Sequence, residues 1–118
     1  MRSVFAILLL LTTGSASSSP SAAHTTGNAQ QSQGKQVFDR WCMYCHAPGP
    51  RFPGTASLAV KYGTQIPAAL QERTDLTYEV VHHFVRSGAL IMPPFRKTEI
   101  TDAELDALSA YLSRTSAK

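Results

Sequence analysis

The sequence predicts a small all-α fold of three main helices joined by short turns, and three observations support this class. Apolar side chains recur at helical spacing in three stretches, at about 33–44, 77–88 and 101–112. No stretch alternates polar and apolar residues as a half-buried strand does. Setting the N-terminal region aside leaves roughly 85 residues, a domain size that often needs a staple or a cofactor.

The N-terminal region is typical of a secretory signal. Arg2 precedes the apolar run at 4–11, and small polar residues follow this run. A membrane span needs ~20 apolar residues, so this run is too short to be one. Cleavage can follow Ala16 or Ala23, because each has a small residue two places earlier. We therefore expect an exported protein with no membrane span.

Three regions follow along the chain. We assign 1–23 to the signal peptide and 24–32 to a flexible leader. The leader is rich in Ser, Thr, Ala and Gln, and it lacks the large apolar residues that would repay its ordering entropy. The folded domain then covers 33–118.

The charge balance is too mild to indicate nucleic acid. The chain has eleven Lys and Arg against eight Asp and Glu, and removing Arg2 with the signal leaves ten against eight, a net charge of +2. No basic run with interleaved aromatic residues occurs. Weak electrostatic steering toward an acidic protein partner is compatible with this charge.

The first two predicted helices have clear apolar faces. In the first, at about 33–44, Val37, Phe38 and Trp41 share one face. The second begins near Thr77, a suitable N-cap, and ends at Gly88, a suitable C-terminal glycine. Its apolar stripe consists of Val80, Val81, Phe84 and Val85.

The third predicted helix opens with a capping box, Thr101 to Glu104. It continues with Leu105, Leu108, Tyr111 and Leu112 on one face. Shorter helical turns are expected at 56–63 and at 67–73, where Pro67 suits a first helical position. Gly34 is expected to permit close approach of the two terminal helices, with Phe38, Leu108 and Tyr111 near their crossing.

The stretch Trp41-Cys42-Met43-Tyr44-Cys45-His46 holds both cysteines of the chain. A Cys42–Cys45 disulfide is possible in an oxidising compartment, but so short a loop constrains the unfolded chain very little. A redox dithiol of this spacing expects a βαβ setting, which this sequence lacks. A structural zinc site needs four ligands, and the remaining histidines (His24, His82 and His83) form no second pair.

The remaining interpretation is Cys-x-x-Cys-His, the attachment motif of a c-type haem. Positions i, i+3 and i+4 of a helical turn share one face. Cys42 and Cys45 can then each form a thioether to one haem vinyl group, and His46 can reach the iron. The motif predicts one covalent haem, which would fill the centre of the small domain.

Met92 is the predicted second axial ligand. Haem iron in electron-transfer cytochromes commonly takes a histidine and a methionine. Met1 leaves with the signal, and Met43 lies inside the attachment turn. Met92 precedes two prolines, which hold its loop extended. The competing ligands are His82 and His83, adjacent in the second predicted helix.

Further residues are candidates for contacts around the haem. The free ring nitrogen of His46 needs an acceptor, and a carbonyl of Pro50 or Pro53 can provide it; we favour Pro53. Five polar or aromatic side chains are candidates for contact with the haem propionates: Trp41, Lys61, Tyr62, Arg73 and Arg86.

With these residues in place, the chain resembles the class I cytochrome c family over about 33–113. The attachment motif, the Met-Pro loop and the C-terminal ALSAYL carry this resemblance. The chain is similar, more narrowly, to the cytochrome subunits of bacterial flavocytochromes that oxidise 4-alkylphenols, such as p-cresol methylhydroxylase and eugenol hydroxylase. The residues of this narrower match are PGTASLAVKYG, QERTDLT, FVRSG and MPPFRKTEITDAELDALSAYL.

The resemblance implies a periplasmic subunit that binds an FAD-containing oxidoreductase and takes electrons singly from its reduced flavin. A downstream acceptor (a cytochrome, a cupredoxin or an oxidase) would then receive them. It also implies that Cys42 and Cys45 hold the haem, while His46 and Met92 ligate its iron. A free-standing electron carrier and a thiol oxidoreductase are the alternatives. The sequence shows no general base, nucleophile or substrate pocket, so we expect an electron-transfer protein and not an enzyme.

Overall fold

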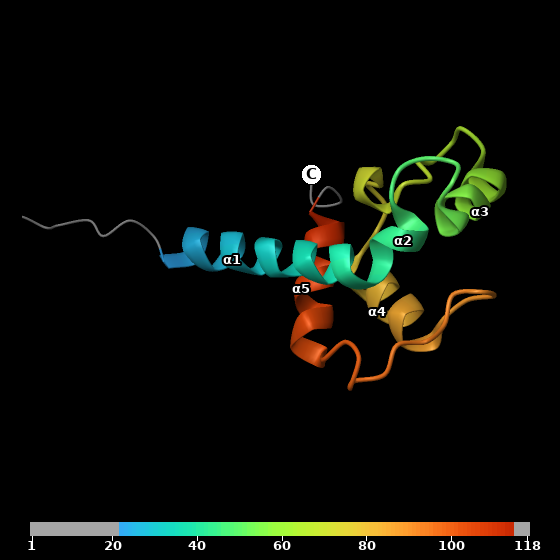
Figure 1. Ribbon diagram of the computed structural model, residues 1–118. Coiled ribbons are helices and arrows are strands. Elements are labelled where there is room, and N and C mark those ends of the chain that lie inside the picture. Colours follow the sequence, from blue (N-terminus) through green and yellow to red (C-terminus); the bar gives the residue numbers. More distant parts are fainter. Residues whose placement is uncertain (1–21, 115–118) are drawn as a thin grey trace, which may run out of the picture.

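The described part of the chain, residues 22–114 of a computed structural model, is helical and contains no strand (Figure 1). This confirms the predicted all-α class. The predicted signal peptide, 1–23, lies outside the described residues except for its last two. The elements in order are α1 (Ala22–Val37), a π-helical turn η1 (Phe38–Cys42), α2 (Met43–His46), α3 (Pro53–Tyr62), a 3₁₀ turn η2 (Leu70–Glu72), α4 (Tyr78–Ser87) and α5 (Asp102–Ser113).

Helix α1 begins earlier than the sequence predicts. The segment at 24–32 was expected to be a flexible leader, and the structure has it within α1. Ala29, Gln30 and Gln31 are good helix formers, but residues 25–28 (TTGN) are not, so local propensity alone does not explain the early start. Gln31 also ties this end to α5, because its Nε2 donates to the Ala110 carbonyl at 2.9 Å. Figure 1 shows the N-terminal part of α1 reaching beyond α5.

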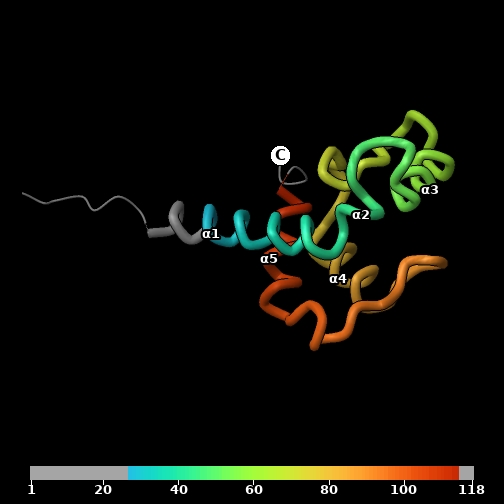
Figure 2. Tube along the Cα trace, viewed as in Figure 1, coloured from blue at the N-terminus to red at the C-terminus, as the bar shows by residue number. Residues whose placement is uncertain are grey.

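Helices α1 and α5 cross at Gly34, as expected. A Cβ at Gly34 would lie 2.0 Å from the Ala107 carbonyl oxygen and 2.6 Å from Tyr111 Cβ, so only glycine fits this contact. Phe38, the first residue of η1, is 1% exposed, and its ring centroid lies 6.0 Å from that of Tyr111. The tube in Figure 2 shows the same crossing.

The π turn η1 connects the crossing to the attachment motif. The Met43 N–H donates to the Phe38 carbonyl, five residues earlier, so this turn holds one residue more than an α turn. Phe38 and Cys42 are its two buried residues. The predicted helix at 33–44 is therefore one run of α1, η1 and α2, and it ends at His46.

The middle of the chain differs in detail from the prediction. A short turn was expected at 56–63, but α3 is a ten-residue helix with Pro53 in its first turn. Pro67 was expected at a first helical position and lies outside any helix; the 3₁₀ turn begins at Leu70. The first error arose from the Pro53-Gly54 pair, because such a pair usually favours a turn.

Both predicted N-caps are present. Thr77 Oγ1 accepts from the Val80 N–H at 3.3 Å, and Gly88 ends α4 at φ +70°. Thr101 and Glu104 form the complete capping box of α5. The buried apolar core comes chiefly from α1, α4 and α5 and includes Phe38, Val81, Val85, Ile100, Leu105, Leu108 and Leu112.

No helix within residues 22–114 is long and apolar enough to cross a membrane.

Candidate functional site

A cavity of about 610 Å³ lies between the end of the first helical run, α3, α4, the 89–95 loop and α5. Its volume falls in the range of ~300–1,000 Å³ that is usual for ligand and cofactor sites. Most of the side chains that line it are apolar. Cys42, Cys45, His46 and Met92, the four residues predicted from the sequence, all line this one cavity.

The two cysteines lie at one wall of the cavity, on either side of the start of α2. Both thiols are free, so the structure has no Cys42–Cys45 disulfide. Cys42 is 9% exposed, and this burial, with a smaller contribution from Cys45, raises the pKa of its thiol to about 12. Cys45, three residues on, is exposed. The buried and the exposed thiol thus reach the cavity from one helical turn.

The His46 imidazole is held at the end of α2 by close packing. Burial lowers its pKa, because desolvation disfavours the charged ring, and this favours the neutral form that ligates metals. Its Nδ1 is buried without a hydrogen-bond partner among the described residues. The Pro53 carbonyl, our expected acceptor, instead accepts from Ser57 Oγ at 2.8 Å. That expectation is therefore wrong in this structure.

Gly54 contacts the His46 ring directly. A Cβ at this position would lie 2.6 Å from His46 Cε1 and 2.8 Å from both His46 Nδ1 and the Cys45 carbonyl oxygen. The neighbouring Thr55 donates its hydroxyl to the Ala47 carbonyl at 2.8 Å and so ties α3 to the end of α2. Glycine at position 54 thus lets α3 pack closely against the imidazole.

Met92 lies in the loop after α4, where residues 89–92 form a turn closed by two backbone hydrogen bonds. The Ala89 N–H donates to the Met92 carbonyl at 3.0 Å, and the Met92 N–H donates to the Ala89 carbonyl at 2.9 Å. Between them Leu90 takes a left-handed conformation, with φ +53°. A Cβ at Gly88 would lie 2.6 Å from the Met92 carbonyl oxygen, so glycine also lets the loop fold back onto the end of α4.

Neither competing histidine lines the cavity. His82 stacks on Tyr78, with 4.2 Å between ring centroids, and its Nε2 lies 3.1 Å from Asp106 Oδ1 on α5. His83 packs edge to face against Phe84 at 5.2 Å. Among residues 22–114 no group of three or more His, Cys, Asp or Glu side chains could hold a metal ion. Of the three candidates for the second ligand, Met92 is thus the one that lines the cavity.

A polar cluster forms one part of the cavity wall and contains three of the predicted propionate contacts. The Arg73 guanidinium lies 4.7 Å from the centre of the Tyr62 ring, and Lys61 Nζ lies 5.0 Å from the same centre. Arg73 also donates to both carboxylate oxygens of Asp75, at 2.9 and 2.5 Å. This pairing is the main reason that the pKa of Asp75 is lowered.

The other two propionate candidates behave differently. Trp41 lines the cavity and packs edge to face on Phe95 at 5.9 Å, and its Nε1 is buried without a partner within the described region. Arg86 does not line the cavity. Its guanidinium bonds to the carbonyls of Phe95 and Ile100 and to Asp102. The structure thus separates Arg86 from the site.

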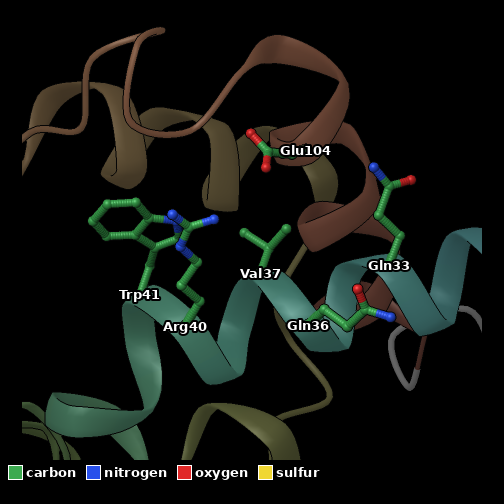
Figure 3. Close-up of a pocket in the computed structure, with 6 residues that line it drawn as sticks. All are labelled: Gln33, Gln36, Val37, Arg40, Trp41 and Glu104. Atoms are coloured by element: carbon green, nitrogen blue, oxygen red, sulfur yellow. The ribbon is translucent and has the colours of Figure 1, made fainter.

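Trp41 also borders a second, smaller cavity of about 200 Å³ between α1 and α5. Figure 3 shows its ring beside the Arg40 guanidinium, with Glu104 facing them from α5. Arg40 Cζ lies 5.2 Å from the centre of the Trp41 ring. Glu104 accepts from the Thr101 N–H and hydroxyl, each at 2.8 Å. None of the predicted haem-attachment or ligand residues lines this smaller cavity, so the larger one is the candidate site.

Sequence reasoning missed two residues of the site. Gly54 follows a proline, which indicates a turn and gives no sign of contact with His46. Asp75 lies two residues after Arg73, a short-range pairing that the sequence could have suggested. The contacts of Arg86 carry no sequence signal, because they go to backbone carbonyls nine and fourteen residues away.

The residues at the cavity fit a covalently attached haem. Two thiols, an imidazole and a thioether border one mostly apolar cavity. The His46 Nδ1 is buried without a hydrogen-bond partner among the described residues, and a Cβ at Gly54 would clash with the His46 ring. The imidazole is therefore tightly packed. Thiols attach haem, and imidazole with thioether is a common pair of iron ligands.

Comparison with known proteins gives one family. The family model described as "Cytochrome C oxidase, cbb3-type, subunit III" matches residues 29–112, well over half of the chain. The matched segment includes the attachment motif, the cavity and Met92. No curated protein and no solved structure matches the chain.

Proposed function

Because the chain belongs to the family described as cytochrome c oxidase, cbb3-type, subunit III, and is thus a c-type cytochrome that carries electrons, we propose that it is a periplasmic monohaem carrier of single electrons. Its partner would be an FAD-dependent 4-alkylphenol hydroxylase or dehydrogenase, and it would be that enzyme's electron-accepting subunit. The observation that carries the proposal is the one cavity bordered by Cys42, Cys45, His46 and Met92.

In this proposal the haem supplies an iron that is reduced and reoxidised by one electron. Cys42 and Cys45 would hold it covalently from the end of the first helical run. His46, kept neutral by burial, would offer a ring nitrogen to the iron, and Gly54 fixes the plane of that ring by close packing. Met92 would offer its sulfur from the opposite loop. The mostly apolar lining would limit the access of water to the iron.

Lys61, Tyr62 and Arg73 would face the haem propionates. Arg73 is 5% exposed and already has one carboxylate partner in Asp75. A buried guanidinium that bonds carboxylates in a fork geometry suits a further carboxylate of the cofactor. Lys61, which is exposed at the end of α3, adds a second positive charge to this wall.

Partner contact would occur where apolar residues border the cavity and face solvent. Leu90 and Ile91 both line it and are 105% and 78% exposed, and Phe84 beside them is 42% exposed. Such a patch is typical of interaction sites. Figure 1 shows the loop that carries Leu90 and Ile91 on the same side of the molecule as α3. From Met43 to Gln71 the chain has no acidic residue, so Arg51 and Lys61 give this side a mild positive charge.

Purification of the native complex tests the proposal. The protein should be captured from the periplasm, and its absorption spectrum recorded for haem and for flavin together. Co-purification of a flavoprotein that reduces the cytochrome on addition of a 4-alkylphenol is the expected result. A cytochrome that is recovered without a flavoprotein, and that no flavoprotein reduces, would contradict the flavocytochrome role.

A free-standing carrier between another dehydrogenase and a terminal oxidase is the second candidate. The family match is compatible with this role as well, because it supports a haem-based electron carrier without specifying the partner. In that case the purified cytochrome would be reoxidised by a terminal oxidase and would lack a stable flavoprotein partner.

A further inference from the structure

Arg86 lies in the last turn of α4 and connects three separate parts of the chain. Its Nη1 donates to the carbonyls of Phe95 and Ile100, both at 3.0 Å. Its Nη2 donates to Asp102 Oδ1 at 2.8 Å. The guanidinium thus joins the end of α4, the end of the Met92 loop and the start of α5. The side chain is 24% exposed, so solvent screens these contacts only in part.

The Met92 loop, residues 89–95, is fixed at both ends, and Arg86 helps to hold the second end, at Phe95. At its start, the Ala89–Met92 backbone pair and the close approach of Gly88 hold the chain against α4. At its end, the Phe95 N–H donates to the Val85 carbonyl at 2.8 Å, and the Phe95 carbonyl accepts from Arg86. Both polar groups of the Phe95 backbone are therefore bonded to α4.

Between these two ends the loop has few other means of support. Pro93 and Pro94 have no N–H to donate, and both side chains are exposed. Leu90 and Ile91 are also exposed and pack little. Met92 itself packs against the buried core, so its position depends on that packing and on the two ends of the loop, of which the Phe95 end is held by a side chain from outside the loop.

We infer that Arg86 is the positioning residue that holds the Met92 thioether at the iron, through its bonds to the Phe95 and Ile100 carbonyls. This inference rests on the proposed function, since it presumes a haem in the cavity. Arg86 does not line the cavity, and its hydrogen bonds go to Phe95, Ile100 and Asp102. It acts by fixing the backbone on which Met92 lies, so removing it should loosen the sulfur ligand and leave the thioethers and His46 unaffected.

The experiment compares Arg86→Gln, Arg86→Lys, Asp102→Asn and Lys97→Gln in the haem-loaded protein. Two quantities are measured: the affinity of the oxidised protein for added imidazole, and the temperature at which the sulfur-to-iron charge-transfer band disappears. Arg86→Gln should raise imidazole affinity about ten- to a hundredfold, the factor expected for losing hydrogen bonds from a charged donor. Its band should disappear at a lower temperature than in the unsubstituted protein.

The other variants separate the carbonyl bonds from the ion pair. Arg86→Lys keeps the charge, but a single ammonium lacks the fork that spans two carbonyls, so it should also raise imidazole affinity. Asp102→Asn removes only the carboxylate partner and should change affinity less than threefold. Lys97 bonds only that same carboxylate, at 2.7 Å and largely in solvent, so Lys97→Gln is the matched control. An Asp102→Asn effect equal to that of Arg86→Gln would overturn the inference, as would an Arg86→Lys protein that behaves as the unsubstituted one.

Amide hydrogen exchange gives a readout that does not depend on haem. In Arg86→Gln the Phe95 amide should exchange faster, while amides in the middle of α5 keep their rates. Faster Phe95 exchange with unchanged imidazole affinity would overturn the link to Met92. A protein whose spectrum shows no haem would instead refute the proposed function, so the two failures are distinguishable.

Discussion

At the scale of single residues, the two sides of the cavity are built differently. His46 lies on a short helix, and its ring packs against Gly54. A Cβ at Gly54 would lie 2.6 Å from His46 Cε1. Met92 lies on the 89–95 loop, and its neighbours Leu90 and Ile91 are exposed. In the proposed function, the rigid side would carry the covalent attachment, and the looser side would carry the ligand that can dissociate.

Replacing Met92 should therefore change the haem more than replacing either nearby histidine. In Met92→Ala the weak sulfur-to-iron charge-transfer band of the oxidised protein should vanish. The reduction potential should fall, because thioether ligation favours ferrous iron. Absorption spectra and a redox titration measure both effects, and the haem should stay attached through Cys42 and Cys45.

His82→Ala and His83→Ala are the controls for that prediction. Neither histidine lines the cavity, and each already packs on another ring. Both variants should keep the band and the potential. If a histidine variant loses the native spectrum while Met92→Ala keeps it, the iron has two histidine ligands and Met92 is not one of them.

Charge at the rim gives a second prediction at this scale. Arg51→Glu should slow electron transfer from the partner and weaken association, mainly at low salt, since rim charges act on association rate. Arg96→Glu should have less effect, because Arg96 is already paired with Glu99 through its backbone and side chain. Stopped-flow reduction at two ionic strengths measures this difference. Equal rates for Arg51→Glu and the unsubstituted protein would place the contact elsewhere.

At the scale of helices, the crossing of α1 and α5 depends on Gly34. Gly34→Ala adds a methyl group 2.0 Å from the Ala107 carbonyl oxygen, so the two helices must move apart. Overpacking of this kind costs ~1–3 kcal/mol of unfolding free energy. Chemical denaturation of the two proteins measures the loss.

Gly27→Ala, in the same helix, is the matched control. A Cβ there would have nothing within 4 Å. The change should leave stability equal or raise it by up to ~1 kcal/mol, since alanine has the higher helix propensity. Equal destabilisation by both changes would show that close approach at Gly34 is not what matters.

The capping box of α5 predicts an acid-sensitive contribution to stability. Bonds from the Thr101 backbone, and then from its side chain, lower the pKa of Glu104 below its ordinary 4.5. A carboxyl with a lowered folded-state pKa stabilises the fold above its unfolded pKa, and this stabilisation disappears as the pH falls through the folded value. Unfolding free energy should therefore decrease from about pH 4.5 downward.

Thr101→Ala tests this contribution. At neutral pH it should cost ~0.5–2 kcal/mol, the usual range for loss of an N-cap. It should also flatten the acid side of the stability profile, because Glu104 then loses the hydroxyl that bonds it. Urea unfolding between pH 3 and pH 7 measures both effects, and an unchanged acid slope would show that other carboxyls dominate it.

The bounds of a helix could be predicted where its caps lie within one turn of its ends, and could not where contacts with distant parts of the chain set them. Thr77, Gly88 and Thr101 are local signals, because a cap needs only residues within one turn, and α4 and α5 were predicted with their caps. The early start of α1 and the full length of α3 were missed. Gln31 bonds Ala110, and Thr55 bonds Ala47, so these elements are held by contacts with other parts of the chain that local propensity does not include.

At the scale of the whole molecule, the site residues also divide into those with a local sequence signal and those whose role depends on contacts between distant parts of the chain. Cys42, Cys45, His46 and Met92, which line one cavity, could be predicted because the motif and the methionine count identify them in sequence. Gly54 and the contacts of Arg86 were not found, since they depend on where separate elements meet. The Pro53 carbonyl was assigned wrongly to His46, because backbone acceptors cannot be chosen before the loop geometry is known.

The size of the cavity predicts that the haem is part of the core. A domain this small, with about 610 Å³ at its centre, has little other apolar material with which to close that space. Mass spectrometry of the denatured mature protein should give the cleaved chain plus one haem. The double variant Cys42→Ser, Cys45→Ser, prepared without haem, should unfold at lower temperature and less cooperatively.

Two results would contradict that prediction. Free thiols at Cys42 and Cys45 in the mature exported protein would exclude thioether attachment. A haem-free double variant that unfolds as sharply, and at the same temperature, as the haem-loaded protein would show that the helices close the cavity without it.

The π turn at Phe38–Cys42 restricts which changes in chain length this region can tolerate. Each residue of an α-helix advances about 100° around its axis, so deleting one residue from the turn would rotate the attachment motif by that angle relative to Phe38. The cysteines would then face away from the cavity while Gly34 and Phe38 still packed on α5. Asp39 and Arg40, which are half-buried and exposed, can change identity without this effect. Between Gly34 and Cys42, positions 39 and 40 therefore tolerate substitution, whereas an insertion or deletion anywhere in this interval would misplace the motif.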